Sequence, residues 1–319
     1  MDALPIAVLV APDKFKGTFT AVTVAETIAA ATNWESDLAP IADGGDGTAE
    51  VLLRALGGEW VQARAHDALG GTIDARFALL TGGEDAVVEV AEASGLARLA
   101  GRDLQPLEAG SEGTGELVAA AIDSGARRVF VACGGSATTD AGLGALGRFN
   151  PAAVELVCLC DVADNFVGAL RYAPQKGAGE EEIGELRGRL QRIAAELPQD
   201  PSGLPFTGAA GGLAGGFWAH GARLVAGAPH VLATIDFDRR LAAAEAVITG
   251  EGRLDQTSLA GKAVGEVASR AVLAGRPCHA IVGRDRLEGK GRASFASITE
   301  AETLEQVASA AAALGQHLV

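Results

Sequence analysis

The sequence has 319 residues, 48% of them hydrophobic, so one large or two moderate domains can bury a sizeable core and extensive disorder is excluded. A net charge of −15 argues against sequence-independent nucleic-acid binding, which needs a basic face. No apolar run reaches the roughly 18 residues of a membrane span, and the N-terminus lacks the basic lead of a signal peptide. We therefore expect a cytoplasmic protein with a small-molecule substrate and neither nucleic-acid nor membrane partners.

The chain begins with alternating strand and helix patterns. Residues 6–10 form an apolar run of strand length, and residues 37–42 form a second one. Between these two strands, a capping-box pattern from Thr23 to Glu26 predicts the start of a helix. Residues 48–56 have the periodicity of a second helix. This βαβα order favours a parallel sheet.

The pattern then changes to that of an antiparallel pair. Residues 59–66 and 72–80 are predicted strands, joined by a glycine-bearing loop of hairpin length at 67–71. A third short strand is expected at 85–91. The change predicts that a different lobe is inserted after the first βαβα unit.

Helix and strand patterns alternate over the remainder, with a loop or linker expected at 199–205. The expected helices are 116–122, 141–146, 180–197, 261–273 and 303–314, and the expected strands are 128–133, 154–160, 244–249, 277–283 and 293–298. We therefore predict an α/β protein of two lobes. A parallel-sheet lobe of Rossmann or flavodoxin type is formed by 1–57 plus 231–319, and a mixed-sheet α/β lobe by 58–230.

Cysteine and lysine usage both carry information. The four cysteines show no CxxC spacing and lie in apolar, strand-like runs, so we expect buried free thiols at Cys133, Cys158, Cys160 and Cys278. Only five of the 26 basic residues are lysines. Four lysines lie in segments that contain glycines, which suits phosphate binding, although these lysines could also have no such role. They are Lys14, Lys16, Lys176 and Lys262.

Glycine-rich segments follow both strands of the first βαβα unit. The carboxyl ends of strands are where open α/β sheets bind ligands, and exposed backbone N–H groups there bind anions. After the first strand, Asp13 and Lys16 could hold a metal and a phosphate, or form an ordinary polar turn. After the second strand, Asp43 and Asp46 are candidates for Mg²⁺ or a base, or for turn caps. The accompanying candidates for phosphate binding are Gly44, Gly45, Gly47 and Thr48.

Two similar segments lie in the predicted second lobe. The one after residues 128–133 could form a nest for phosphate, although no P-loop motif occurs in the chain. Asp161 follows residues 154–160 and precedes a loop that carries Lys176, and it could position a hydroxyl group or cap a turn. The candidate phosphate-binding residues of the first segment are Gly134, Gly135, Ser136 and Thr138.

A fifth segment follows the predicted strand at 244–249 and carries charges of both signs. Its members are Glu251, Arg253, Asp255 and, further on, Lys262. Such a cluster beside a buried strand is costly unless it binds a ligand or pairs internally. Acidic groups beside glycine turns and lysines, with scattered histidines and no nucleophile triad, are typical of phosphoryl transfer.

Seven motifs resemble, in order and over almost the whole chain, those of the glycerate kinase type-1 family. They are APDKFKGTFTA, ADGGDGTAE, SEGTGELVAAAIDSGARRVFVACGGSATTDAG, CDV, APQKGAG, GAAGGLAGG and VITGEGRLDQTSLAGKAVGEVA. The resemblance implies transfer of the ATP γ-phosphoryl group to D-glycerate, typically giving 2-phosphoglycerate, with Mg²⁺. The chain departs from the family pattern at Lys14 and Thr139 and in a shortened stretch after Gly147. These departures concern substrate preference and leave room for a weakened enzyme.

Under this hypothesis glycerate lies between the lobes, with its carboxylate on Arg253 or Lys16. The expected catalytic residues are Lys16, Asp43, Asp161, Lys176 and Asp255. The expected substrate- and phosphate-binding residues are Asp13, Gly44, Gly45, Gly47, Thr48, Gly134, Gly135, Ser136, Thr138, Glu251, Arg253 and Lys262. Asp43, Asp161 and Asp255 would bind Mg²⁺ or accept the hydroxyl proton, while Lys176 and Lys262 would neutralise charge. A kinase for another hydroxy acid, a weakened glycerate- or nucleotide-binding protein, and a homodimer all remain open.

Overall fold

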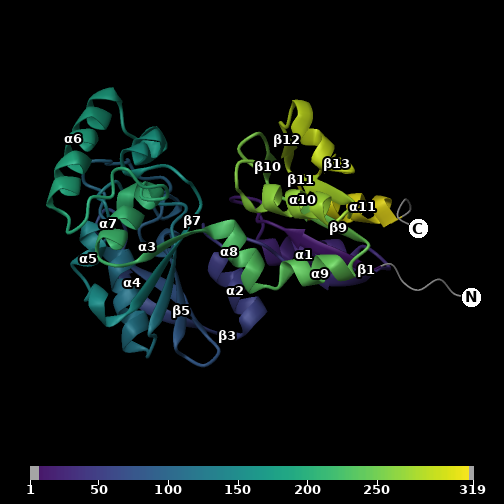
Figure 1. Cartoon of the computed structure of the whole chain (residues 1–319), viewed down its shortest axis with the longest axis horizontal. Helices are drawn as coiled ribbons and strands as arrows, with labels where there is room; N and C mark the ends of the chain where they lie inside the picture. Colours follow the sequence, from purple (N-terminus) through teal and green to yellow (C-terminus); the bar gives the residue numbers. More distant parts are fainter. Residues whose placement is uncertain (1–6, 316–319) are drawn as a thin grey trace, which may run out of the picture. The chain divides into compact units, whose positions relative to one another are not determined.

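The computed structural model describes residues 7–315, so Ile6, the first residue of the expected N-terminal strand, lies outside the described residues. The chain folds into two compact units (Figure 1). The first unit is formed by the residues up to Asp43 together with those from Ala228 onward, and the second unit by Gly44–Gly227. Between residues 7 and 315, no helix is both long and apolar enough to cross a bilayer.

The first unit is built on a parallel sheet with the strand order β13-β11-β9-β1-β2. The chain passes from β1 to β2 on one side, and from β9 to β11 and β13 on the other. The strand order therefore reverses between β1 and β9, and ligands bind at the carboxyl ends of the strands at such a point in open α/β sheets. The strands are β1 (Ala7–Pro12), β2 (Glu35–Leu38), β9 (Ala246–Gly250), β11 (Cys278–Val282) and β13 (Ser297–Glu300).

Helices pack on this sheet and bury its apolar side chains. Val8 and Val10 of β1 lie in one cluster with Ile28 of α1 and Val307 of α11, all fully buried. The helices are α1 (Ala21–Ala30), α8 (Gly227–Thr234), α9 (Phe237–Ala243), α10 (Ala263–Leu273) and α11 (Leu304–Gly315), with the 3₁₀ turn η5 (Gly289–Ser294). Short strands β10 (Arg253–Leu254) and β12 (Arg284–Asp285) form a separate parallel pair.

The predicted start of the first helix is wrong by three residues. Thr20 is the N-cap of α1, and its hydroxyl accepts a hydrogen bond from the N–H of Thr23 at 3.2 Å. Thr23 therefore lies inside the first turn, because a threonine with suitable backbone geometry already stands three positions earlier. The second predicted strand also shifts: β2 ends at Leu38, although the N–H groups of Ala39 and Ile41 still bond to the carbonyls of the β1 strand.

The second unit contains a mixed sheet with the order β3-β4-β5-β6-β7-β8. The pairs β3–β4 and β4–β5 are antiparallel, and the pairs from β5 to β8 are parallel. The predicted α/β fold class, with one parallel sheet and one mixed sheet, is confirmed. The strands are β3 (Gly58–His66), β4 (Thr72–Leu80), β5 (Asp85–Glu89), β6 (Arg128–Ala132), β7 (Glu155–Cys160) and β8 (Arg223–Ala226).

Helix α2 packs against β4 and β5 of this sheet. The predicted lobe boundaries at 57/58 and 230/231 stay a prediction, and residues 199–205 form a loop inside the second unit. The helices are α2 (Thr48–Leu56), α3 (Val90–Ala93), α4 (Glu112–Asp123), α5 (Leu143–Leu146), α6 (Glu180–Glu196) and α7 (Leu213–Ala219). The 3₁₀ segments are η1 (Leu96–Leu99), η2 (Pro151–Ala153), η3 (Phe166–Lys176) and η4 (Ala209–Gly212).

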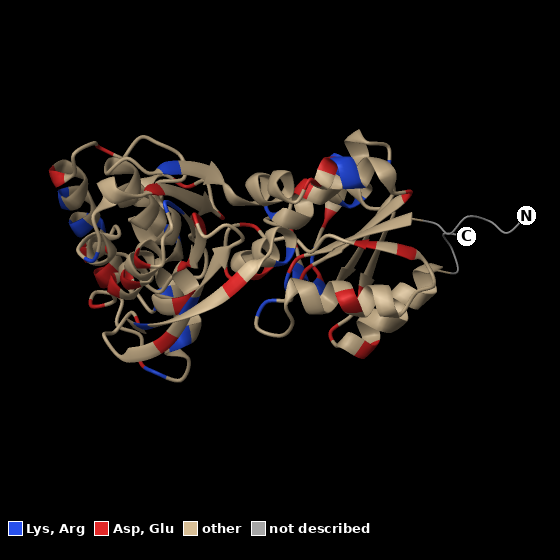
Figure 2. Ribbon diagram, turned by 90° about the horizontal axis from the view of Figure 1, so that it is seen from below, with Lys and Arg blue, Asp and Glu red and all other residues tan. Residues whose placement is uncertain are grey.

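The cysteines lie in the interior, whereas charged residues are spread over the elements of each unit. All four cysteines are buried free thiols, which confirms the prediction from their spacing. Burial raises the pKa of the Cys278 thiol to about 12, so this thiol stays protonated and unreactive at neutral pH. Acidic and basic residues are interspersed along the helices and loops of each unit (Figure 2).

Candidate functional site

The segments that leave β1 and β9 are joined at the reversal point of the first unit. The N–H of Asp13 donates to the carbonyl of Gly250, the last residue of β9, at 2.7 Å. Asp13 is buried, and its Oδ1 accepts from the N–H of Lys14 at 2.7 Å. The candidate residues Asp13 and Lys16 therefore leave the sheet where a ligand is expected.

Three carboxyl groups lie near one another at this position. The ammonium of Lys14 is 4.0 Å from Oδ1 of Asp43. Glu251 follows β9, and its buried Oε1 has no hydrogen-bond partner within the part of the chain that the structure describes. Burial raises the pKa of Glu251 to about 8; the charges of Asp13 and Asp43 act in the same direction, while a hydrogen bond from Ser258 and the charge of Lys262 oppose it. The site therefore favours a cation or a proton beside Glu251.

Arg253 and Asp255 pair with each other, which is one of the two outcomes that the sequence left open. Arg253 Nε lies 3.1 Å from Asp255 Oδ2. Asp255 Oδ1 also accepts from the hydroxyl of Thr257 at 2.6 Å and from its N–H at 2.9 Å. These hydrogen bonds lower the pKa of Asp255, and the bond from the Thr257 hydroxyl has the largest effect. The carboxylate of Asp255 is therefore better suited to binding a cation than to accepting a proton.

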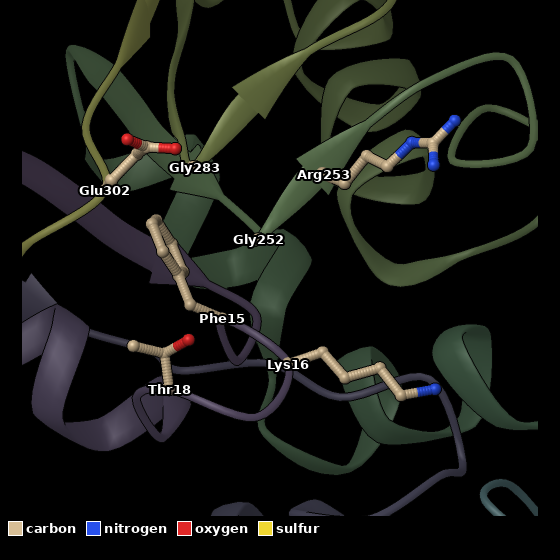
Figure 3. Close-up of a pocket in the computed structure, with 7 residues that line it drawn as sticks. All are labelled: Phe15, Lys16, Thr18, Gly252, Arg253, Gly283 and Glu302. Atoms are coloured by element: carbon tan, nitrogen blue, oxygen red, sulfur yellow. The ribbon is translucent and has the colours of Figure 1, made fainter.

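A pocket of about 290 Å³ opens beside these residues in the first unit. Figure 3 shows Lys16 and Arg253 extending to the same side and Glu302 on the opposite side. A Cβ on Gly252 would lie 3.1 Å from the backbone nitrogen of Lys16, so a side chain there would crowd the turn. The lining residues are Phe15, Lys16, Thr18, Gly252, Arg253, Gly283 and Glu302.

In the second unit, the structure brings together three of the segments that the sequence singled out. The N–H of Gly134 donates to the carbonyl of Gly44 at 3.1 Å. A Cβ on Gly134 would lie 2.5 Å from Gly45 Cα and 3.0 Å from Asp161 Oδ2. Gly44 has φ of 93°, and a Cβ there would meet the carbonyl of Leu159 at 2.7 Å. Only glycine fits at these contacts, which holds the loops and Asp161 close together.

The start of helix α2 is capped by a residue that the sequence analysis did not select. Gly47 is the N-cap, with no side-chain bond of its own, and the N–H of Ala49 donates to Glu89 Oε1 at 2.7 Å. Burial raises the pKa of Glu89 to about 7 against the effect of the backbone donors. The hydroxyl of Thr48 is buried and donates to the Gly45 carbonyl at 2.7 Å, so it holds the turn. An acid at the end of an apolar strand was the signal that could have identified Glu89.

Lys176 braces the loop that follows β6. Its ammonium donates to Ser136 Oγ at 2.9 Å and to the Thr138 carbonyl at 2.6 Å, and the side chain is 6% exposed. Burial lowers the pKa of Lys176 to about 8, although Asp140 and Asp161 oppose the shift. Among residues 7–315, the buried hydroxyl of Thr138 has no partner. Lys176 therefore holds the candidate phosphate-binding loop in place through two hydrogen bonds.

Asp140 is a second residue that the sequence analysis did not select. Its carboxylate accepts from the N–H and the hydroxyl of Ser111 at 3.0 and 2.6 Å, and from the N–H groups of Gly142 and Gly144 at 3.1 and 3.2 Å. It thereby ties the starts of α4 and α5 together. Ala141, directly after it, is fully buried with φ of 58°, so this loop is held in a strained conformation by its surroundings.

The expected metal ligands are distributed over both units. Asp43 and Asp255 belong to the first unit and Asp161 to the second. From Ala7 to Gly315, no group of three or more acidic, histidine or cysteine side chains is arranged to hold a metal ion. Mg²⁺ typically takes only one or two carboxylates, together with waters and substrate phosphates.

The sequence of this chain matches the glycerate kinase family over residues 8–150 and 148–318. The two matches meet where the sequence shows its shortened stretch. A glycerate kinase of Halalkalibacterium halodurans is 34% identical, over 86% of this chain and 85% of the relative. The glycerate 2-kinase of Escherichia coli is 32% identical, over 86% of this chain and 84% of the relative.

A solved structure agrees with these matches. The crystal structure of a Salmonella typhimurium LT2 protein assigned as glycerate kinase 2 has a TM-score of 0.82 and 28% identity, and it covers 98% of both chains. The strand exits described above carry several of the motifs on which the family resemblance rests. The chain belongs to the glycerate kinase family.

Proposed function

We propose that this protein transfers the γ-phosphoryl group of ATP to D-glycerate and yields 2-phosphoglycerate, with Mg²⁺ as its cofactor. The observation that carries the proposal is the group of charges at the reversal point of the parallel sheet. There the Lys14 ammonium lies 4.0 Å from Asp43 Oδ1, and the charges of Asp13, Asp43 and Lys262 all act on the buried carboxyl group of Glu251. Phosphoryl transfer requires mainly positioning and charge neutralisation from the protein, and this set of side chains supplies both.

The glycine loops of the second unit support the same reaction. The backbone of Gly134 lies against the backbones of Gly44 and Gly45: its N–H donates to the Gly44 carbonyl, and a Cβ on it would lie 2.5 Å from Gly45 Cα. The glycines of these loops leave room for phosphate oxygens to approach backbone N–H groups. We assign to Gly44–Gly47 and Gly134–Ser136 the binding of phosphate groups, with Lys176 holding the second loop in place.

The residues present fit Mg²⁺. Oε1 of Glu251 is buried without a hydrogen-bond partner in the described part of the chain, and the charges of Asp13 and Asp43 disfavour its ionisation. A divalent cation beside these groups would relieve both costs. Asp43, with Glu251 beside it, would hold the ion, whose charge would offset that of the triphosphate.

The remaining roles follow from the chemistry of the side chains. Lys16 and Lys262 would neutralise charge on the transferred group. Asp161 touches Gly134, and it would accept the proton of the attacking hydroxyl or bind a second cation. Asp255 has a lowered pKa, which makes it a poor proton acceptor.

Phosphorus NMR of the product tests the proposal. Purified protein is incubated with ATP, MgCl₂ and D-glycerate, and the proton coupling of the product signal is recorded. Coupling to a single methine proton is expected, because the phosphate is then on the second carbon. Coupling to methylene protons would overturn the proposed product, and the absence of any phosphoglycerate signal would overturn the proposed reaction.

A further inference from the structure

The two ends of the pocket of the first unit differ in their polar groups. Lys16 and Arg253 extend to one side, and the carboxylate of Glu302 lies on the other (Figure 3). Between them the wall consists of the Phe15 ring and the glycines Gly252 and Gly283. Glu302 is paired with Arg284, whose Nη2 lies 2.6 Å from Oε1 of the carboxylate, so this end carries an ion pair with little net charge. The wall is therefore weakly polar in the middle and positive at the end of Lys16.

Backbone hydrogen bonds hold this wall in place. The N–H of Gly283 donates to the carbonyl of Glu251 at 2.9 Å, and the N–H of Arg284 donates to the carbonyl of Gly252 at 3.0 Å. A Cβ on Gly283 would collide with the carbonyl of Gly252. The exits of β9 and β11 are thus packed backbone to backbone, and they offer a flat surface to a ligand.

The positive end, the apolar middle and the acceptor oxygens of Glu302 together indicate the chemical class of the ligand. A small hydroxy acid has no flat face and would reach only the positive end, so the middle of the pocket and the Glu302 end would be left unfilled. A nucleotide is flat and uncharged at one end and anionic at the other. An amino group on its base would meet a carboxylate acceptor at Glu302, and its phosphates would meet Lys16 and Arg253.

We propose that this pocket binds the nucleoside part of ATP, with the base near Phe15, Thr18 and Glu302 and the phosphates toward Lys16 and Arg253. The inference rests on the proposed kinase function, which by itself does not say where the nucleotide lies. The pocket volume of about 290 Å³ is at the lower end of the range for small-molecule sites, roughly 300 to 1,000 Å³. The pocket lies where the strand order reverses between β1 and β9, and open α/β sheets bind nucleotides at such points.

Thr18 offers a way to fill the pocket without disturbing the core. Its side chain is exposed at the rim, so Thr18→Trp places a large ring over the base end. The matched control is Thr72→Trp, the same change at an exposed position at the start of β4. Calorimetric titration with ADP should show Kd raised roughly tenfold or more in Thr18→Trp, equivalent to about 1.4 kcal/mol, and unchanged in the control.

Inorganic tripolyphosphate separates the two ends of the pocket. Thr18→Trp should leave the Kd for tripolyphosphate unchanged, because that probe has no base. Lys16→Met should weaken the binding of both ADP and tripolyphosphate. Glu302→Ala is a second base-end variant that adds no bulk, and it should weaken ADP binding only. Circular dichroism and the melting midpoint verify that each variant is folded.

The binding and kinetic outcomes distinguish this inference from the proposed function. If Thr18→Trp and Glu302→Ala bind ADP as tightly as the wild type, the nucleoside assignment is wrong, even when the wild type phosphorylates D-glycerate. If Thr18→Trp raises the KM for D-glycerate instead of that for ATP, the pocket belongs to the acceptor and the inference is overturned. If the wild type shows no turnover, the proposed function is wrong, and the ADP titrations still decide where a nucleotide binds.

Discussion

Replacing Glu89 by glutamine should remove a pH-dependent loss of stability. The carboxyl group is 5% exposed and accepts the N–H of Ala49, and burial raises its pKa from the ordinary 4.5 to about 7. Between those two pH values the folded protein keeps a proton that the unfolded chain has lost. Stability from this group is therefore present below pH 4.5 and is lost as pH rises toward 7.

The size of this loss follows from the pKa shift. One pKa unit corresponds to about 1.4 kcal/mol, so a rise from 4.5 to about 7 corresponds to about 3 kcal/mol. Glutamine has nearly the same shape and keeps an oxygen that can accept the N–H of Ala49, but it cannot ionise. The variant Glu89→Gln should match the wild type near pH 4.5 and exceed its free energy of unfolding by about 3 kcal/mol above pH 7.

Urea unfolding across this pH range measures the difference. Of the three tryptophans, Trp60 in β3 and Trp218 in α7 lie in the second unit and Trp34 lies in the first. In a Trp34→Phe background, tryptophan fluorescence therefore reports on the unit that contains Glu89. Glu59→Gln, at an exposed position on β3, is the control and should show no pH-dependent gain. A difference between Glu89→Gln and the wild type that stays constant from pH 4.5 to pH 8 would refute the assignment of a buried, protonated carboxyl group.

Three further changes test other contacts. Gly44→Ala should abolish activity and lower the free energy of unfolding by more than about 2 kcal/mol, since its Cβ would lie 2.7 Å from a strand carbonyl. Gly70→Ala, where a Cβ meets nothing within 4 Å, should cost only about 1 kcal/mol. Equal urea midpoints for the two variants would contradict this. Ser111→Ala should cost about 2 kcal/mol in urea unfolding, since its buried hydroxyl donates one hydrogen bond and accepts another, whereas exposed Ser124→Ala should be nearly neutral. Asp43→Asn should lower kcat at least about a hundredfold at an unchanged melting midpoint, and full activity would remove its assigned role.

The sequence predicted those features that depend on local patterns. Two strand-length segments on both sides of a glycine-bearing loop of hairpin length identified the β3–β4 hairpin to within a residue. Glycines and charges after apolar runs identified the strand exits, because side chains at carboxyl ends of parallel strands share one edge of a sheet. This rule applies to Gly134 and Asp161, which follow neighbouring strands of one sheet, whereas the approach of Gly44 to Gly134 is a contact that only the structure shows.

Long-range hydrogen bonds explain most of what was missed. Glu89 caps a helix that begins 41 residues earlier, and Asp140 holds a helix whose N-cap is Ser111. Neither partnership leaves a periodic signal in the local sequence, because the acceptor and the donor belong to different elements. Strand β8, only four residues long and partly exposed, is too short for its period to be recognised.

The fate of the γ-phosphate tests the central claim most directly. The protein is incubated with MgCl₂ and ATP that carries radioactive phosphorus in its γ-phosphate, with D-glycerate, with L-glycerate or with neither. The account predicts that the label appears in phosphoglycerate only when D-glycerate is present, with equal release of ADP. Label that appears as free phosphate at the same rate in all three mixtures, or that stays in ATP throughout, would contradict it.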